Sequence, residues 1–159
     1  MARLNRLSLI TATLLVTTCM VRPALAAEPP ADLCSLLPAA DVSKALGQAY
    51  GAPQKSVAPR PFANTTEGTD CYYLAKGNRL WFRAYVDPSP AAATDLFARL
   101  SRFFGPPTPV PVGDQAYFDK NHGLHVRKGK VRFYLAMDNF TAANEKQLES
   151  LASQISGRL

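Results

Sequence analysis

A pattern of strand, short turn and strand occurs twice in this chain, and a helical pattern follows each copy. In the first copy, Lys76 and Gly77 separate two β-rich runs, and the second run ends at Asp87. In the second copy, Lys128 and Gly129 hold the turn. A short turn containing glycine between two such runs predicts a β-hairpin. We therefore expect two β-hairpin-plus-helix units, related as copies of one another.

Alternation with a period of two gives the long strand of each copy one apolar face and one mixed face. The apolar faces carry Leu80, Phe82, Ala84, Val86, Val131, Phe133, Leu135 and Met137. The mixed faces carry Trp81, Arg83, Tyr85, Arg132 and Tyr134. Residues 90–104 repeat apolar positions at spacings of three and four, which predicts an amphipathic helix. We expect this helix to pack on the apolar face, against Leu80 and Phe82.

The remaining elements are one helix before the hairpins, one after them, and further strands. Pro38 begins a short helix that Gly47 ends, and Thr141 begins the last helix, which runs to residue 155. The predicted strands span residues 71–75, 80–86, 115–119, 124–127 and 131–137, with an edge strand expected within residues 55–62. This order predicts an α+β fold, in which helices pack on an antiparallel sheet.

Residues 1–26 have the pattern of a secretory signal peptide. Arg3 and Arg6 precede an apolar run at residues 9–16, and small residues flank Leu25 in the sequence Ala-Leu-Ala. A membrane anchor is the alternative interpretation, but spanning a bilayer takes about 20 apolar residues. We therefore expect cleavage and no membrane span in the mature chain.

The mature chain, residues 27–159, is then a single secreted domain, located in the periplasm or outside the cell. A lipoprotein signal ending at Cys19 is the rival prediction, although the preceding Thr18 does not suit lipidation. Cleavage removes three arginines and leaves 15 Lys and Arg against 12 Asp and Glu. This slight excess of positive charge gives no reason to expect nucleic-acid binding.

Two cysteines remain after cleavage, Cys34 and Cys71, so only one intramolecular pairing is available. In an oxidising compartment a disulfide between them is the expected state. It would tie the first helix to the first strand of the hairpin. A redox-active pair is the alternative, but the chain has no Cys-x-x-Cys sequence.

Several short motifs resemble a family of secreted bacterial proteins of unknown function, many of them actinobacterial lipoproteins. The motifs are Cys34-Ser-Leu-Leu37, Asp41-Val42, Ala45-Leu46-Gly47, Cys71-Tyr72 and Gly113-Asp114-Gln-Ala116-Tyr117. The chain is also distantly similar to the extracellular sensor domains of mycobacterial receptor kinases. The resemblance implies a disulfide-pinned α+β domain with an extracytoplasmic binding role, and it supplies no catalytic residues.

Few residues suggest chemistry. His122 and His125, with Asp114 or Asp119 as a third ligand, could form a metal site of the kind used by hydrolases. A turn followed by a strand places the two histidines on opposite sides, so we expect both at the surface and no metal. Asp114 is expected to cap a turn by accepting backbone hydrogen bonds. No nucleophile elbow is present, and we predict no catalytic residue and no cofactor.

Two more aspartates, Asp87 and Asp138, stand at matching strand ends before helices. Capping of the helix starts explains them without chemistry.

The mixed face of the sheet is the candidate binding surface, formed by Trp81, Arg83, Tyr85, Arg132 and Tyr134. Tryptophan, tyrosine and arginine dominate binding hot spots. The alternative interpretation is a second core, in which the 34–47 helix or the long connection covers this face. We predict a non-enzymatic binding protein of the bacterial envelope, a sensor, inhibitor or immunity-type protein with a protein partner or an envelope ligand. The alternatives are the metal-dependent hydrolase and a structural or accessory envelope protein.

Overall fold

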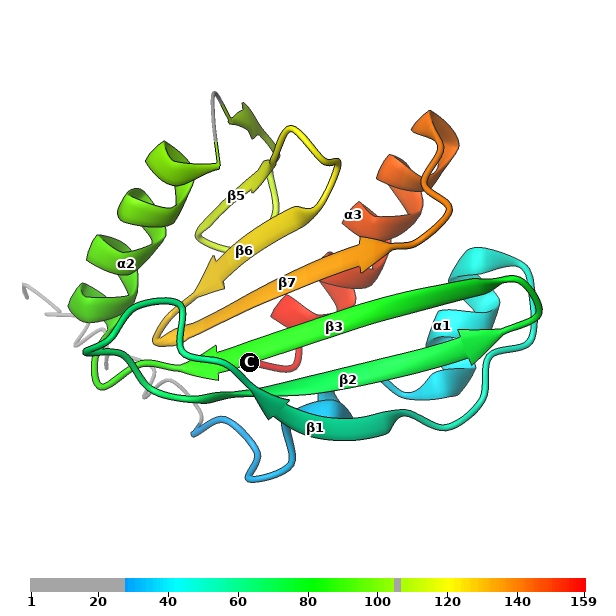
Figure 1. The fold of residues 1–159 in the computed structure, drawn as a ribbon, viewed down its shortest axis with the longest axis horizontal. Helices are drawn as coiled ribbons and strands as arrows, with labels where there is room; N and C mark the ends of the chain where they lie inside the picture. Colours follow the sequence, from blue (N-terminus) through cyan, green and yellow to red (C-terminus); the bar gives the residue numbers. More distant parts are fainter. Residues whose placement is uncertain (1–27, 105–106) are drawn as a thin grey trace, which may run out of the picture.

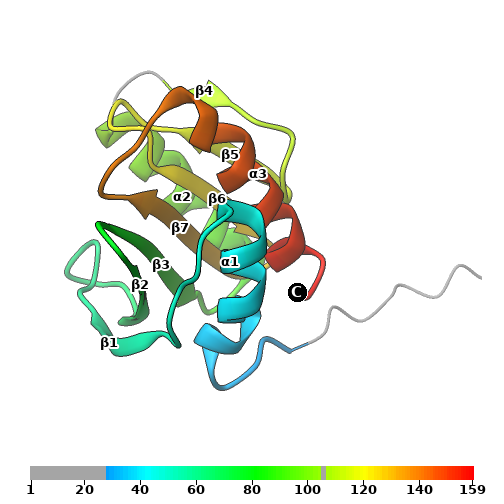
Figure 2. The same ribbon diagram turned by 90° about the vertical axis from the view of Figure 1, so that its right-hand side faces the viewer.

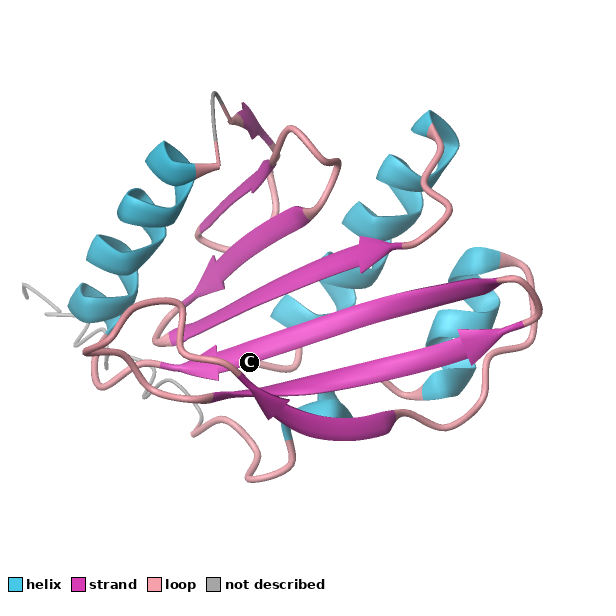
Figure 3. Ribbon diagram, in the orientation of Figure 1, coloured by secondary structure: helices cyan, strands magenta, loops and turns pink. Residues whose placement is uncertain are grey.

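One antiparallel sheet of seven strands forms the centre of the molecule (Figures 1 and 3). The computed structural model describes residues 28–104 and 107–159. Its strands lie in the order β1-β2-β3-β7-β6-β5-β4. The predicted signal peptide, residues 1–26, lies outside the described residues.

The predicted elements follow one another in the expected order, with strand ends shifted by at most three residues, and a further short strand is present at residues 108–109. They are η1 (Leu33–Leu36, a 3₁₀ helix), α1 (Ala39–Leu46), β1 (Gln54–Ala58), β2 (Gly68–Ala75), β3 (Asn78–Val86), α2 (Pro90–Phe103), β4 (Thr108–Pro109), β5 (Gln115–Phe118), β6 (Leu124–Lys128), β7 (Val131–Met137) and α3 (Ala142–Ser156). The predicted α+β class is confirmed. The connection between α1 and β2 contributes β1 at a sheet edge, within one residue of its expected start.

The long strands β3 and β7 are antiparallel neighbours at the middle of the sheet. Their register pairs Arg83 with Tyr134 and Tyr85 with Arg132, so the two mixed faces form one continuous surface. Both predicted hairpins, β2–β3 and β6–β7, are present. The helices that follow them lie on opposite faces of the sheet, so the prediction of two equivalent hairpin-plus-helix units is not confirmed (Figure 2).

The apolar face of the sheet is covered by α1 and α3, which lie side by side (Figure 2). Leu80 and Phe82 of β3 and Leu135 of β7 are fully buried there. From α3, the fully buried residues are Leu148, Leu151, Ala152 and Ile155. This interface is the main hydrophobic core, since burying each large side chain is worth about 1.5–3 kcal/mol.

The predicted docking of α2 on the Leu80 and Phe82 face is wrong. The helix lies on the opposite, mixed face, where the Phe97 ring packs edge-on against Tyr117 with centroids 5.1 Å apart. The core formed with α1 and α3 already occupies the apolar face. The apolar stripe of α2 therefore lies over aromatic rings, and only Ala93 and Phe97 are buried.

The predicted helix ends agree with the structure. The Ser89 hydroxyl accepts a hydrogen bond from the Ala92 amide at the start of α2, with Pro90 as the first helical residue. Thr141 caps α3, and Gly47 ends α1 with φ of 69°. Such caps satisfy amides and carbonyls that a helix leaves unpaired. Across residues 28–104 and 107–159, no helix is long and apolar enough to cross a membrane.

Cys34 and Cys71 are joined, with their Cα atoms 5.8 Å apart. Both residues are buried, and the bond attaches η1 to β2. The Tyr73 hydroxyl adds a second link by donating a hydrogen bond to the Leu37 carbonyl. The start of the described chain is therefore fastened to the apolar face of the sheet by a covalent bond and a buried hydrogen bond.

Removing the disulfide should lower the free energy of unfolding, because the unfolded chain gains conformational freedom. A cross-link closing a loop of 37 residues lowers the conformational entropy of the denatured chain. This raises the free energy of unfolding by about 4 kcal/mol at most. We expect the variant Cys34→Ala with Cys71→Ala to lose up to about that much free energy of unfolding in urea. The reduced wild-type chain is the matched control and should lose a similar amount. Two free thiols in the unreduced, unfolded mature protein would contradict the pairing.

Candidate functional site

A groove of about 550 Å³ opens on the mixed face of the sheet, and we refer to it as the α2 groove. Its floor is made by β3, β6 and β7, one wall by α2, and the opposite wall by the loop before β2. The principal lining residues are Pro59, Arg60, Pro61, Phe62, Trp81, Arg83, Tyr85, Phe97, Leu100, Phe103, Phe104, Asp119, His125, Arg132 and Tyr134. The five residues of the predicted binding face are all among them.

The five predicted residues differ in how far they are covered. Tyr85 is 6% exposed and Arg132 is 3% exposed, whereas Trp81, Arg83 and Tyr134 are partly exposed. The expected second core therefore exists at the end of the groove where Tyr85 and Arg132 lie. Its cover is the 59–62 loop and α2, while the helix at residues 39–46, one of the expected covers, lies on the other face.

Two tyrosines of the floor lie against glycine backbone, Tyr85 against Gly68 of β2 and Tyr134 against Gly123 in the turn before β6. A Cβ atom on Gly123 would approach the Tyr134 ring to 2.2 Å, and one on Gly68 would approach the Tyr85 ring to 2.7 Å. Real Cβ atoms do not come so close, so a larger residue at either position would displace the ring. The flat floor of the groove thus depends on glycine beside each tyrosine.

Arg83 is held in place by an ion pair with Asp70 of β2. Its Nε donates to one carboxylate oxygen at 2.6 Å and its Nη2 to the other at 2.9 Å. The Tyr72 hydroxyl donates a further hydrogen bond to the same carboxylate. The hydrogen bond to Asp70 raises the pKa of Arg83 above its ordinary value, so this side chain is always charged.

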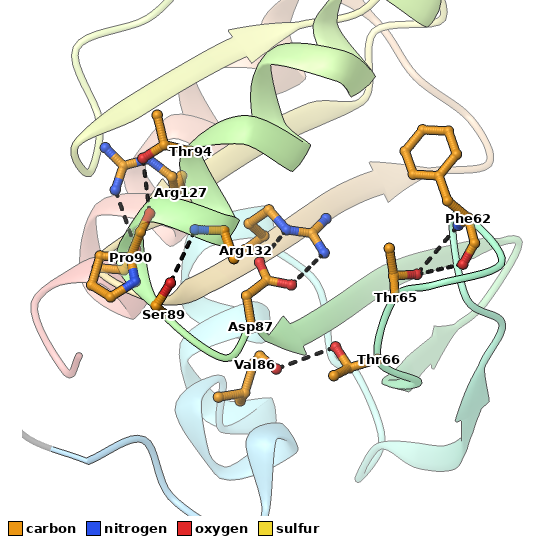
Figure 4. Close-up of polar contacts among 12 residues, drawn as sticks. Phe62, Thr65, Thr66, Val86, Asp87, Ser89, Pro90, Thr94, Arg127 and Arg132 are labelled. Atoms are coloured by element: carbon orange, nitrogen blue, oxygen red, sulfur yellow. Dashed lines mark hydrogen bonds and ion pairs between the residues drawn. The ribbon is translucent and has the colours of Figure 1, made fainter.

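Arg132 makes a second, more deeply buried pair with Asp87 (Figure 4). Its Nε and Nη2 donate to the two carboxylate oxygens at 2.5 and 2.9 Å. The guanidinium also lies over the Tyr85 ring, 5.0 Å from its centroid. The expectation that Asp87 caps the next helix is therefore wrong. Ser89 caps that helix, and the Asp87 carboxylate neutralises the buried guanidinium.

Both walls of the groove are attached at this same end (Figure 4). The Thr66 hydroxyl donates to the Val86 carbonyl at 3.2 Å, which ties the loop to the end of β3. The Tyr85 hydroxyl donates to the Pro59 carbonyl at 2.9 Å. Farther along, the Arg99 guanidinium of α2 lies 4.3 Å from the centre of the Phe62 ring. The loop is therefore tied to the floor at Tyr85 and Val86 and joined to α2 by the contact between Arg99 and Phe62.

His125 lies in the groove among aromatic rings, so the prediction of a surface histidine is wrong for this residue. Its ring stacks on Tyr117 with centroids 4.8 Å apart, and Tyr134 lies at 4.7 Å. Its Nε2 is 2.9 Å from the Asp119 carboxylate. The strand end Tyr117-Phe118-Asp119 pairs with the strand that carries His125, and this pairing brings the groups together, which spacing along the chain does not reveal.

Burial and hydrogen bonding act oppositely on Asp119. Burial raises the pKa of the carboxyl, but hydrogen bonds from His125 and from the backbone amides of Gly123 and Asn121 outweigh it. The pKa of Asp119 therefore lies below its ordinary value. Burial also raises the pKa of Tyr134 to about 12, with the Asp119 charge adding to the effect. The groove therefore contains an ionised carboxylate and a neutral phenol at neutral pH.

Of the proposed metal ligands, only His125 and Asp119 come together. His122 stacks on Phe140 at the far side of the turn, and Asp114 accepts hydrogen bonds from Arg127, Lys128 and the Gly129 amide. Within the described parts of the chain, no three His, Cys, Asp or Glu side chains are placed to hold a metal ion. Asp114 does cap a turn as expected, although the turn is that of the β6–β7 hairpin.

Asp138 makes an ion pair as well, contrary to the expectation that it caps α3. Arg79 donates to its carboxylate at 3.2 Å, and the α3 cap comes from Thr141.

Comparison of the chain with protein-family models, with curated proteins and with solved structures finds no match. The resemblance to secreted actinobacterial proteins and to kinase sensor domains therefore stays a prediction.

Sequence reasoning missed the wall residues of the groove. The helical stripe that they share predicts burial in the main core, whereas the structure places Phe97, Leu100, Phe103 and Phe104 in the groove wall. One signal was available in the sequence: a stripe of six apolar residues needs a partner surface, and the mixed face offers three aromatic rings to cover, those of Trp81, Tyr85 and Tyr134.

Replacing Arg132 should strongly destabilise the fold, because it leaves the Asp87 carboxylate buried without a partner. We expect Arg132→Met to lower the free energy of unfolding by about 3–5 kcal/mol, measured in urea. The matched control is Arg132→Met combined with Asp87→Leu, which removes both charges and should recover a large part of the loss. If the double variant is no more stable than the single one, the carboxylate is not the source of the cost.

Asp119 should make the fold sensitive to acid. Because its folded-state pKa is lowered from 3.8, its stabilising contribution is complete above that value and is lost as the pH falls through the folded-state pKa. We expect the stability difference between wild type and Asp119→Asn to shrink below about pH 4, measured by urea unfolding from pH 7 to pH 2.5. Asp95→Asn, which alters an exposed carboxylate of α2, should track the wild type throughout.

Proposed function

We propose that this chain is an exported binding protein that takes a small, largely apolar ligand in the α2 groove. The observation that supports this most is the groove itself, an aromatic-walled space of about 550 Å³ on the face with the predicted binding residues. Pockets for small molecules usually measure about 300–1,000 Å³ and combine apolar walls with a few fixed polar groups. The export part of the proposal rests on the pattern of residues 1–26.

The walls favour a ligand with a flat apolar body. Phe62 on the loop side and Phe97, Phe103 and Phe104 on the α2 side all line the groove. Phe103 is 75% exposed, although a large apolar side chain is more stable when covered. A ligand in the groove would bury part of this exposed surface together with Leu100.

The polar groups of the groove support binding better than catalysis. Asp70 and Asp87 are engaged by arginines, and Asp119 accepts from His125 and two amides. Among the described residues, His125 has no hydroxyl or thiol partner that it could activate as a nucleophile. These groups are arranged to fix side chains in position, which is what a binding site requires.

The test uses N-phenyl-1-naphthylamine, a neutral apolar fluorescent probe, with the mature protein. Trp81 is the only tryptophan in the chain and lies in the groove floor, so probe binding should quench its emission by energy transfer. We expect saturable binding that Leu100→Arg weakens about tenfold or more, since that change replaces an apolar contact with a charge.

Ala98→Arg is the matched control, because Ala98 lies on the same helix and is exposed outside the groove. It should leave probe binding unchanged. Equal weakening by both variants, or no saturable quenching at all, would argue against the groove as a ligand site.

A further inference from the structure

Among the described residues of the α2 groove, the hydrogen-bond acceptors already have partners within the protein, whereas some of the donors do not. Asp119 accepts three hydrogen bonds, and Asp70, behind the floor, accepts two from Arg83 and one from Tyr72. The acceptors in and around the floor are therefore engaged. A bound molecule would find few places for its own donors there.

Donors, in contrast, remain available. The Arg83–Asp70 pair uses the Nε and Nη2 side of the guanidinium, and Nη1 has no hydrogen-bond partner among the described residues. A guanidinium has five N–H groups, so three remain, two of which form the fork between Nη1 and Nη2. The Arg83 side chain is 26% exposed and lines the groove, so a ligand can reach this fork.

Trp81 adds a second donor next along the strand. Its Nε1 is buried and lacks a hydrogen-bond partner among the described residues, although buried polar groups are nearly always paired. Tyr72 packs edge-on against the indole with centroids 5.4 Å apart, so the ring is held in place. An acceptor atom bound beside Trp81 and Arg83 would satisfy a donor that the protein itself leaves unpaired.

We infer that the ligand is an apolar, ring-containing carboxylate whose acid group binds the free fork of Arg83, with its body between α2 and the 59–62 loop. This inference rests on the proposed function and specifies the ligand class. A carboxylate matches the two parallel N–H groups of a guanidinium, and such charge-assisted pairs are about twice as strong as neutral ones. The fixed Asp70 partner holds the fork in position before a ligand binds.

Isothermal titration calorimetry with three probes of the same shape tests the inference. They are 2-naphthoate, its neutral counterpart 2-naphthamide, and the cation 2-naphthylmethylammonium. We expect naphthoate to bind about tenfold or more tightly than either of the others, the factor for a hydrogen bond to a charged group. Arg83→Lys, which keeps the charge beside Asp70 but removes the fork, should abolish this preference, and Trp81→Phe should reduce it.

Arg127→Lys is the matched control, because Arg127 is also paired with an aspartate on this side of the sheet but does not line the groove. It should leave the naphthoate preference intact. Equal binding of all three probes would overturn the carboxylate inference and leave the proposed function standing. Binding of N-phenyl-1-naphthylamine with no binding of naphthoate would also overturn the carboxylate inference and leave the proposed function standing. If no apolar probe binds, both proposals fail together.

Discussion

The buried pair between Arg132 and Asp87 determines how the mixed face of the sheet is used. It lies where β3 ends and α2 begins, with the guanidinium supplied by the neighbouring strand β7. Because neither charge can be left alone in a buried place, the end of β3 and the start of β7 must stay together. The start of α2 and the Thr66 loop are attached within a few residues of this point. The position of both groove walls therefore depends on this pair.

The two faces of the sheet bury side chains in different ways. On the apolar face, aliphatic side chains from α1, α3 and the strands fill the space between the layers. On the mixed face, arginines and tyrosines are kept in place by aspartates, glycines and ring stacking. The planar side chains of arginine and tyrosine do not interdigitate with the side chains of a single helix as aliphatic side chains do. A groove remains where α2 and the loop cover the strands only from the sides.

The sequence was sufficient to predict the elements but not their arrangement around the sheet. Ser89, Pro90 and Gly47 act locally, so the helix ends could be read from neighbouring residues. The Cys34–Cys71 bond could be predicted because these are the two cysteines outside the predicted signal peptide. The face taken by α2 depends on competition with α3 for the same apolar surface, and no local pattern encodes that outcome. The His125–Asp119 contact likewise arises from strand pairing.

Buried ion pairs are seldom the most stable way to build a protein, since apolar residues of similar size often do as well or better. Among the described residues, the buried ion pairs lie on the mixed face of the sheet, and stability alone does not explain this placement. A guanidinium held by a carboxylate has lost its side-chain freedom before any ligand arrives, so binding to it costs less entropy. Arg83 meets this description, because one side is fixed by Asp70 and the other remains available in the groove. A guanidinium that a carboxylate orients toward an apolar space is the physical basis of the binding site that we propose.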